Sequence, residues 1–335
     1  MVLKEERMKT IKWGFLATGR ICRWFAAALS VTEGAQRYAV ASRTEEKAVK
    51  FAAEYGFEKA YGSYEALLQD PEVDIVYIGT PVGEHYKHIR MCLEAGKNVL
   101  CEKSLTINAA QAREVIALAR EKKLFLMEAM WMKCQPVFRE VRKWAEDGLL
   151  GEVQAADVTF YTACGKGHRL YNYETAGGAL LDLGIYPVTY ACSFLGYHPE
   201  EVLSSMVIGE KKVDYFDSVV LRYPGGKVAH LASGLGSERI ITSYLLGSKG
   251  RVTLQNDQWF YQAQKAQLLD FDNNVIAEAN GPFLKNGYEF EAMEVQKCLL
   301  EGRTESELVP LDETIAVMEL LDRIRDKAGF RYSFE

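Results

Sequence analysis

The sequence predicts an α/β protein that begins with a doubly wound parallel sheet and continues into an α+β domain with a large, open, mostly antiparallel sheet. Three observations support this. Apolar strands alternate with helices up to residue 122, strands of alternating polarity follow after about Trp131, and 335 residues exceed one typical core. We expect a dinucleotide-binding domain over residues 1–130 and a substrate-binding and dimerisation domain over 131–335, with the last helices able to pack back on the first domain.

The first strand and the turn after it suggest a phosphate site. An apolar run from Thr10 leads through small residues and glycine into a helix, and residues 35–42 form a second strand at βαβ spacing. Such a turn directs backbone N–H groups and the positive end of the helix dipole at one point. Ala17, Gly19 and Cys22 stand where a dinucleotide fingerprint has glycine, so two of the three positions are small residues other than glycine. The preceding strand, the following helix and the second strand at βαβ spacing predict a Rossmann fold here, with an ordinary strand-turn-helix as the alternative. The cofactor-binding candidates here are Ala17, Thr18, Gly19, Arg20 and Ile21.

The end of the second strand indicates which dinucleotide binds. An acidic residue there would bind the ribose 2′-hydroxyl of NAD and repel the 2′-phosphate of NADP. This chain has Ser42, Arg43 and, one turn later, Lys47. A serine hydroxyl and two cations can hold a phosphate, so NADP is expected, with NAD as the alternative. The two cations could instead be solvated residues at a helix entrance.

The remaining elements of both domains follow from their spacing. In the first domain we expect helices at 44–55, 63–68, 85–95 and 109–122, and strands at 73–79 and 98–101. In the second, we expect strands at 152–161, 202–208, 218–223, 227–235, 251–255 and 258–269, then helices at 288–301 and 312–327. An open antiparallel sheet has one buried face and one that is wet or used for association.

Two places carry groups suited to proton transfer. Glu102 and Lys103 follow a strand of the parallel sheet, at the edge where ligands bind. Asp182 and Tyr186 are four residues apart, on one face of a helix that begins after Gly177-Gly178. A lysine opposite the phenol would lower the pKa of that phenol toward the working pH. The alternatives are a surface ion pair and a core tyrosine with a satisfied hydroxyl.

Together these motifs resemble the Gfo/Idh/MocA family of oxidoreductases. The resemblance covers nearly the whole chain, including the Thr80-Pro81 turn with His85, the segment 130–136 and the segment 148–153. Within the family, residues 128–131 and 177–187 are most similar to the branch of dihydrodiol dehydrogenase and NADP-dependent D-xylose dehydrogenase, which has tyrosine where other members carry histidine.

The resemblance implies a Rossmann domain, a second domain whose sheet often forms dimers, and specific residue roles. Lys103 corresponds to the lysine of the family's Glu-Lys-Pro motif, Tyr186 to the acid/base and Asp182 to its helix neighbour. The resemblance adds further cofactor-binding residues, which are Thr80, Pro81, His85, Glu102, Lys103 and Trp131. It also implies a set of substrate-binding residues, which are Lys103, Trp131, Phe160, Asp182 and Tyr186. Tyr161, His168 and Arg169 are further candidates for the pocket lining. Ser104 replaces the family's proline after the lysine, which we expect to loosen the backbone there.

The predicted function is that of an NADP-dependent oxidoreductase acting on a sugar or a cyclic diol. Tyr186 would exchange the hydroxyl proton, Lys103 would assist, and Asp182 would hydrogen-bond Lys103 or the substrate. A non-catalytic dinucleotide-sensing regulator, or an imine or tetrapyrrole reductase on the same scaffold, are the alternatives. We expect a homodimer or homotetramer formed through the second sheet.

Composition argues against several other classes of protein, namely nucleic-acid-binding, metal-binding, secreted and membrane proteins. The formal net charge is -6 and no basic run occurs, so no nucleic-acid partner is expected. The seven cysteines are scattered without a C-x-x-C pair, which favours reduced thiols in the cytoplasm and no metal site. Residues 1–10 are charged and lack an apolar run, so we expect neither a signal peptide nor a membrane segment, and Met8 could itself be a start.

Overall fold

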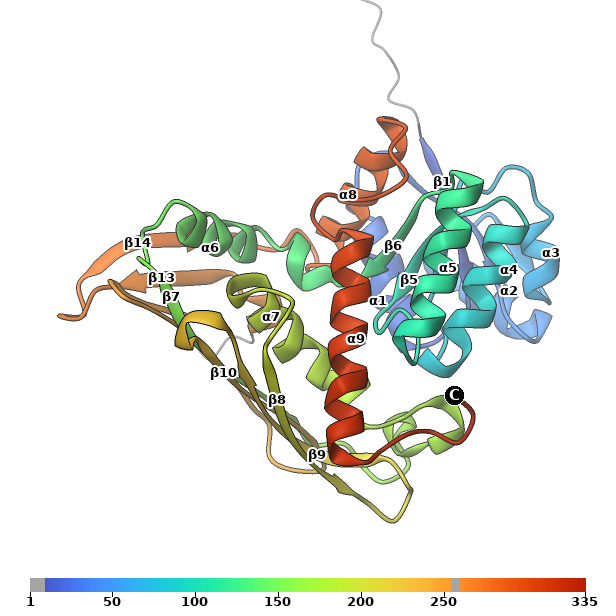
Figure 1. Cartoon of the computed structure of the whole chain (residues 1–335). Helices are drawn as coiled ribbons and strands as arrows, with labels where there is room; N and C mark the ends of the chain where they lie inside the picture. Colours follow the sequence, from blue (N-terminus) through green and yellow to red (C-terminus); the bar gives the residue numbers. More distant parts are fainter. Residues whose placement is uncertain (1–9, 255–259) are drawn as a thin grey trace, which may run out of the picture.

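Two sheets lie beside each other, and one long helix, α9 (Leu311–Ala328), runs along the boundary between them (Figure 1). The computed structural model describes residues 10–254 and 260–335. Sheet A has the strand order β3-β2-β1-β4-β5-β6, and all of its pairings are parallel. Its strands are β1 (Ile11–Leu16), β2 (Ala35–Ala41), β3 (Lys59–Tyr61), β4 (Ile75–Ile78), β5 (Asn98–Glu102) and β6 (Leu126–Ala129). The predicted Rossmann architecture is confirmed.

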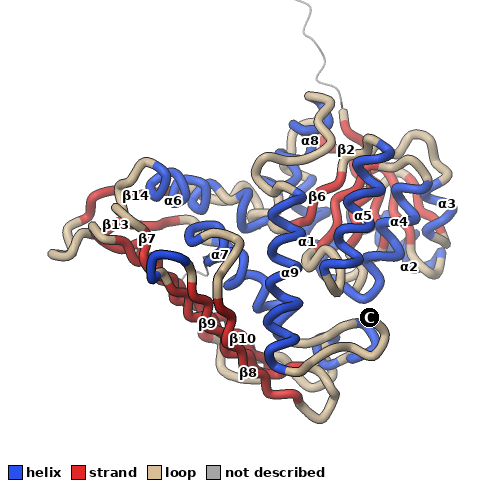
Figure 2. Tube along the Cα trace, viewed as in Figure 1, coloured by secondary structure: helices blue, strands red, loops and turns tan. Residues whose placement is uncertain are grey.

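Helices connect these strands and cover the sheet (Figure 2). They are α1 (Arg20–Leu29), α2 (Glu45–Tyr55), α3 (Tyr64–Leu68), α4 (His85–Glu94) and α5 (Ala109–Lys122). Strand order reverses between β2 and β4 on either side of β1, so the carboxyl ends of these strands border a crevice, the usual ligand position of this fold. The turns after β1, β2, β4 and β5 all lead to this edge of the sheet.

Sheet B is larger and mixed. Its order is β14-β13-β12-β11-β7-β10-β9-β8, with β7 and β10 parallel and the other pairs antiparallel. Its strands are β7 (Val153–Thr162), β8 (Glu201–Ile208), β9 (Asp214–Arg222), β10 (Val228–Leu235), β11 (Ile240–Gly247), β12 (Gly250–Leu254), β13 (Lys265–Leu269) and β14 (Val275–Asn280). The prediction of a mostly antiparallel sheet is therefore confirmed.

Several elements of the structure are not in the sequence-based prediction. β11 has apolar residues on both faces, including the exposed Ile240, Tyr244 and Leu246, so the polarity contrast that marks a half-buried strand is missing. β14 is a mostly exposed edge strand, and β3 and β6 are three and four residues long. The strand expected at 258–269 begins only at Lys265 within the described residues, after a helical turn at Phe260–Gln262, and positions 255, 258 and 259 lie outside them.

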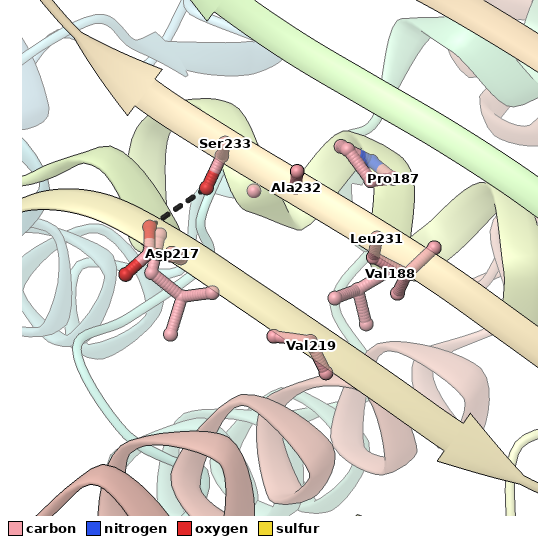
Figure 3. Close-up of a pocket in the computed structure, with 9 residues that line it drawn as sticks. Pro187, Val188, Asp217, Val219, Leu231, Ala232 and Ser233 are labelled. Carbon is pink, nitrogen blue, oxygen red and sulfur yellow. Dashed lines mark hydrogen bonds between the residues drawn. The ribbon is translucent and has the colours of Figure 1, made fainter. Parts of the chain in front are cut away.

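Helices α6 (Pro136–Glu146) and α7 (Ile185–Leu195) cover the inner face of sheet B (Figure 1). Pro187 and Val188 of α7 lie over Leu231 of β10 and Val219 of β9, in the core between the helix and the sheet (Figure 3). The chain then returns to the first domain, where α8 (Glu289–Leu300) contacts α1, and α9 contacts α5. These returning helices fix the two sheets relative to each other.

One described helical stretch, residues 173–195, is long and apolar enough to cross a bilayer. However, 78% of its most apolar window is buried inside the protein, where α7 packs against sheet B. Core helices commonly have this composition, so the apolar character is explained by packing.

Candidate active site

Lys103 follows β5 directly, and the residue after it is firmly held. The Lys103–Ser104 peptide bond is cis. Ser104 is fully buried, and its hydroxyl donates a hydrogen bond to the carbonyl of Leu181 at 2.7 Å. Its own carbonyl lies 2.8 Å from the Nδ1 atom of His85. The expectation that Ser104 loosens the backbone is therefore wrong, because side-chain and main-chain hydrogen bonds fix it on two sides.

His85 connects two turns at this edge of sheet A. Its Nε2 atom is 2.8 Å from the carbonyl of Thr80, so both ring nitrogens face backbone carbonyls. Burial lowers the pKa of His85 to about 4, so the ring is neutral at pH 7 and has one N–H to donate. The ring is only 1% exposed, so it supports the Thr80-Pro81 turn and the Lys103 segment from within.

Asp182 lies opposite Lys103 and receives two cations. The Lys103 ammonium donates to the Asp182 backbone carbonyl at 2.5 Å and to its Oδ1 atom at 3.2 Å, and the Arg169 guanidinium donates to the same Oδ1 at 2.8 Å. Burial alone would raise the pKa of Asp182, but Arg169 and Lys103 hold it well below its usual range. Asp182 is therefore an anion that orients Lys103.

Tyr186 faces the same lysine with its ring and not with its hydroxyl. The Lys103 Nζ atom is 4.8 Å from the ring centroid, while the hydroxyl accepts a hydrogen bond from the indole N–H of Trp131 at 2.7 Å. Burial, with Tyr288 and Glu102 nearby, raises the pKa of Tyr186 well above its ordinary value. The structure differs from the expectation that Lys103 lowers this pKa: burial of the phenol dominates, and the opposing effect comes from the hydrogen bond of Trp131.

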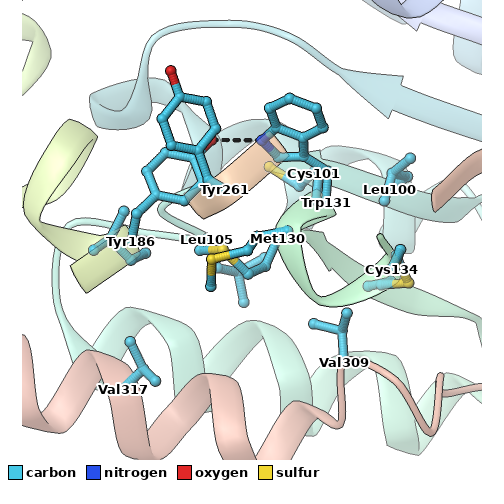
Figure 4. Packing of buried hydrophobic residues seen from close by; sticks show 14 of the residues in the cluster. Leu100, Cys101, Leu105, Met130, Trp131, Cys134, Tyr186, Tyr261, Val309 and Val317 are labelled. Carbon is cyan, nitrogen blue, oxygen red and sulfur yellow. Dashed lines mark hydrogen bonds between the residues drawn. The ribbon is translucent and has the colours of Figure 1, made fainter. Parts of the chain in front are cut away.

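Aromatic rings pack around the Tyr186 side chain, and Figure 4 shows two of them, Trp131 and Tyr261. Trp131 stacks on Tyr288 at a centroid distance of 4.1 Å, and Phe160 stacks on Tyr261 at 4.9 Å. Tyr261 also lies 4.9 Å from the Tyr186 ring. The structure thus brings Lys103, Asp182, Tyr186, Trp131 and Phe160 together, as predicted.

Sequence analysis missed two of the wall residues, Tyr261 and Tyr288. They lie 75 and 102 positions beyond Tyr186 in the chain, one after β12 and one before α8. No motif spacing joins them to Tyr186. Tyr261 comes from the helical turn between β12 and β13 of sheet B, whereas Tyr288 comes from the segment that returns to the first domain. Tertiary folding alone brings both rings to this place.

The turn after β1 is shaped to receive a phosphate. Ala17 has a φ of +94°, a conformation in which glycine is favoured, and Gly19 caps α1 without a side-chain hydrogen bond. A Cβ atom on Gly19 would meet only the Gly79 carbonyl, at 4.0 Å, so the helix N-terminus is open to a ligand. At the third position Cys22 fills the space left by Gly79, where a Cβ would lie 2.4 Å from its Sγ atom. Burial raises the pKa of Cys22 to about 12, which leaves it an unreactive packing thiol.

The other predicted cofactor residues lie around this turn. Arg20 begins α1, with its guanidinium 3.4 Å from the Nε2 atom of His168. Ser42 is buried at the end of β2, whereas Arg43 and Lys47 are exposed and form no ion pair with any described residue. Glu102 points to the core, where it accepts a hydrogen bond from Tyr77 at 2.6 Å. Two groups of predicted cofactor residues thus follow neighbouring strands of sheet A, at the edge where ligands bind. The fingerprint residues follow β1, and Ser42, Arg43 and Lys47 follow β2.

Comparison with known proteins agrees with this arrangement. Residues 11–130 match the "Oxidoreductase family, NAD-binding Rossmann fold", and residues 138–253 match the "GFO/IDH/MocA C-terminal domain". The chain belongs to the Gfo/Idh/MocA family of oxidoreductases. This confirms the resemblance inferred from Lys103, Asp182 and Tyr186.

Curated relatives of this Gfo/Idh/MocA protein extend over its whole length. It is 35% identical over 330 residues to trans-1,2-dihydrobenzene-1,2-diol dehydrogenase of Xenopus tropicalis, an alignment that covers 96% of this chain and 99% of the relative. The Homo sapiens enzyme of the same name is 34% identical over 329 residues, with 96% and 98% covered.

Solved structures show the same two-domain fold. The 3-ketoreductase KijD10 of Actinomadura kijaniata, in complex with NADP and TDP-benzene, has a TM-score of 0.84 and 27% identity, with 95% of this chain and 98% of that chain covered. A levoglucosan dehydrogenase has a TM-score of 0.86 at 18% identity, with 96% and 97% covered, which shows a shared fold.

Proposed function

We propose that this protein is an NADP-dependent oxidoreductase that transfers hydride between the nicotinamide and a hydroxyl-bearing carbon of a cyclic trans-diol or a sugar. The observation that carries the proposal is the contact of Lys103 with both Asp182 and the Tyr186 ring at the carboxyl end of β5. The names of the dihydrodiol dehydrogenase relatives support the substrate class, and the KijD10 complex supports the dinucleotide.

The open N-terminus of α1 and the turn at Ala17 would hold the pyrophosphate, and Ser42, Arg43 and Lys47 would hold the 2′-phosphate. When bound, the cofactor supplies the hydride chemistry. Three features of this turn fit such a group: the positive φ of Ala17, the absence of a side-chain hydrogen bond at the N-cap residue Gly19, and the open space beside Gly19.

In our proposal the side chains handle the proton. Tyr186 takes the proton of the substrate hydroxyl during oxidation and returns it during reduction. Asp182 holds the Lys103 ammonium beside the Tyr186 ring, where its charge stabilises an oxyanion. The aromatic walls of Trp131, Phe160 and Tyr261 pack against the carbon faces of a ring-shaped substrate and exclude water.

The test of the catalytic assignment compares two tyrosines on one helix. Tyr186→Phe is expected to reduce kcat by about 100-fold or more, as for loss of a general acid or base, and Lys103→Met by a similar factor. Tyr190→Phe, a buried tyrosine one turn further along α7, serves as the control and should keep near-normal turnover. Full activity of the Tyr186→Phe and Lys103→Met proteins on trans-diols and aldoses would refute the assignment.

Cofactor preference is tested by binding, which requires no substrate. NADP should raise the melting temperature more than NAD at equal concentration, because binding to the native state stabilises it. Arg43→Asp should reverse this preference, whereas Lys50→Asp, on an exposed position of α2, should not. A larger shift with NAD in the unaltered protein would contradict the NADP assignment.

We also propose that the protein forms a homodimer or homotetramer through the outer face of sheet B. This face carries the exposed apolar side chains of Leu203, Val207, Phe216, Tyr244 and Leu246. An apolar sheet face of this kind is typical of an association surface. Val207→Glu together with Tyr244→Glu should shift the mass measured by light scattering to that of the 37.7 kDa chain, and an unaltered mass would contradict this interface.

A further inference from the structure

Two buried aspartates lie beneath the active-site turn, and both belong to β9. Asp214 and Asp217 are 1% and 3% exposed. Residues three apart on a regular strand point to opposite faces. Here the register shifts, with Val207 opposite Phe216 but Ile208 opposite Asp214, so that Tyr215 is an extra residue in β9. This β-bulge turns both carboxyl groups toward the inner face.

Asp214 holds the start of the turn that carries Asp182. Its Oδ2 atom accepts a hydrogen bond from the backbone N–H of Leu180 at 2.5 Å. Its Oδ1 atom lies 2.0 Å from the position that a Cβ atom on Gly178 would take, and Gly178 has a φ of +134°. The second glycine of the Gly177-Gly178 pair is therefore required for this contact.

Asp217 is the less satisfied member of the pair. Its Oδ2 atom accepts from the Ser233 hydroxyl at 2.7 Å (Figure 3). Its Oδ1 atom is buried and has no hydrogen-bond donor among the residues that the structure describes. A small cavity of about 10 Å³ borders it. Burial, and then the neighbouring carboxyl of Asp214, raise the pKa of Asp217 well above its usual value, and burial raises that of Asp214 to about 6.

Few other polar groups face the pair. Ser233 approaches from β10 and the Leu180 N–H from the turn. From the C-terminal segment, the Tyr332 hydroxyl donates to the Gly177 carbonyl, and the Arg325 guanidinium lies 5.7 Å from the Tyr332 ring centroid. Arg325 is itself paired with Asp322 and Glu335.

The turn next to Asp214 and Asp217 is the part of the chain that binds the Lys103 ammonium. Residues Leu180–Gly184 form a π-helical turn, a rare geometry that is frequent at functional sites. The carbonyl of Leu181 accepts from Ser104, and the carbonyl of Asp182 accepts from Lys103. A shift of this turn would therefore move Asp182, Lys103 and Ser104 together.

We propose that Asp214 and Asp217 are positioning residues: they share one proton and, as a carboxylic acid and carboxylate pair, clamp the π-helical turn so that Asp182 keeps Lys103 beside Tyr186. This inference rests on the proposed function of Lys103 and Tyr186. In this proposal the β9 bulge turns both carboxyl groups toward the turn, and Gly178 leaves the space that Asp214 occupies. Lys103 and Tyr186 by themselves give no reason for either feature.

The first test uses carboxylate-to-amide and carboxylate-to-alanine variants. In Asp217→Asn the amide can donate to Asp214 at every pH, so kcat near pH 7 should fall by no more than about threefold. At alkaline pH both carboxyl groups of the wild type ionise and the wild type loses this hydrogen bond. The ratio of variant to wild-type kcat should therefore rise at alkaline pH. Asp214→Ala removes the acceptor for Leu180, and kcat should fall by about 10- to 100-fold with unchanged dinucleotide binding. Glu278→Gln, an exposed change on β14 of the same sheet, is the control.

The proposal is overturned if Asp214→Ala keeps normal kcat, or if the ratio for Asp217→Asn is independent of pH. A second readout needs no turnover and remains available if Asp214→Ala does not fold. Because the pKa of Asp217 is raised by folding, its contribution to stability is present below about pH 4 and is lost as the pH rises. The melting temperature of Asp217→Asn relative to wild type should therefore increase with pH, and a constant difference would also overturn the shared proton. If the wild type turned over no diol or sugar, the proposed function would fail while this measurement still tested the pair.

Discussion

The Lys103 ammonium lies over the face of the Tyr186 ring, 4.8 Å from its centroid, while the Tyr186 hydroxyl accepts a hydrogen bond from the indole N–H of Trp131 at 2.7 Å. The phenol is therefore oriented by an uncharged donor, and the lysine is oriented by Asp182. Trp131 thus orients the Tyr186 hydroxyl, while Lys103 places a positive charge beside the Tyr186 ring. Substitutions at these positions can test the two roles separately.

Trp131→Phe removes the only donor to the Tyr186 hydroxyl among the described residues while keeping an aromatic wall. We expect kcat to fall by about 5- to 10-fold, the value of one lost hydrogen bond, with a smaller change in dinucleotide affinity. Trp144→Phe is the matched control, because Trp144 is also buried and its indole donates to Glu140 on α6, away from the site. Equal losses in the two variants would indicate a general packing effect.

The raised pKa of Tyr186 predicts opposite pH dependences for the two directions of the reaction. The phenol remains protonated through neutral pH, so reduction, which needs a proton donor, should have a flat kcat/KM between about pH 6 and pH 9. Oxidation needs the deprotonated oxygen, so its kcat/KM should rise with pH over the same range. Steady-state rates measured in both directions provide the check, and an oxidation rate that falls as the pH rises would contradict the assignment of Tyr186 as base.

Ala17→Gly should stabilise the protein. Ala17 adopts a φ of +94°, which costs a residue with a Cβ atom roughly 1–3 kcal/mol of stability. Glycine removes this strain, but its greater freedom in the unfolded chain lowers the stability by about 0.4–1 kcal/mol. A net gain of about 1 kcal/mol in the free energy of unfolding is expected from denaturant titration. Ala27→Gly, inside α1, is the opposite control and should destabilise, because glycine is unfavourable in a helix. A destabilised Ala17→Gly protein would show that the turn tolerates this φ without strain.

Glu128 should make stability depend on pH near neutrality. It is buried on β6 and accepts a hydrogen bond from the Leu105 N–H at 2.9 Å, and burial raises its pKa to about 7. Since this pKa is above the unfolded value of about 4.3, the folded protein binds an extra proton, and stability is lost as the pH rises through about 7. Glu128→Gln keeps an oxygen for Leu105 and removes the titration, so its melting temperature relative to wild type should increase from about pH 5 to pH 8.

The control for this measurement is Glu121→Gln, an exposed change on α5. Its difference from wild type should stay constant over the same range. A constant difference for Glu128→Gln as well would mean that Glu128 is ionised in the folded protein at all these pH values.

Local patterns in the sequence were enough to predict the fold and the candidate groups of the site. Alternating strands and helices predict a parallel sheet whose carboxyl edge binds ligands, and Lys103 lies at that edge because it directly follows one of these strands. The spacing of Asp182 and Tyr186 predicts a shared helix face because it reflects one helical turn. Both inferences depend on residues close together in the chain.

Tertiary structure decided how these groups meet. Whether Lys103 lowers the pKa of Tyr186 depends on which part of the phenol it faces and on how deeply the ring is buried, and here burial prevails. Tyr261 enters the site from the helical turn between β12 and β13 of sheet B, and Tyr288 enters it from the segment that returns to the first domain, so that both rings contact Trp131. Asp214 reaches the active-site turn only through a bulge in β9, which arises from its pairing with β8. Register, burial and the approach of distant segments are properties of the folded chain, and no local pattern in the sequence encodes them.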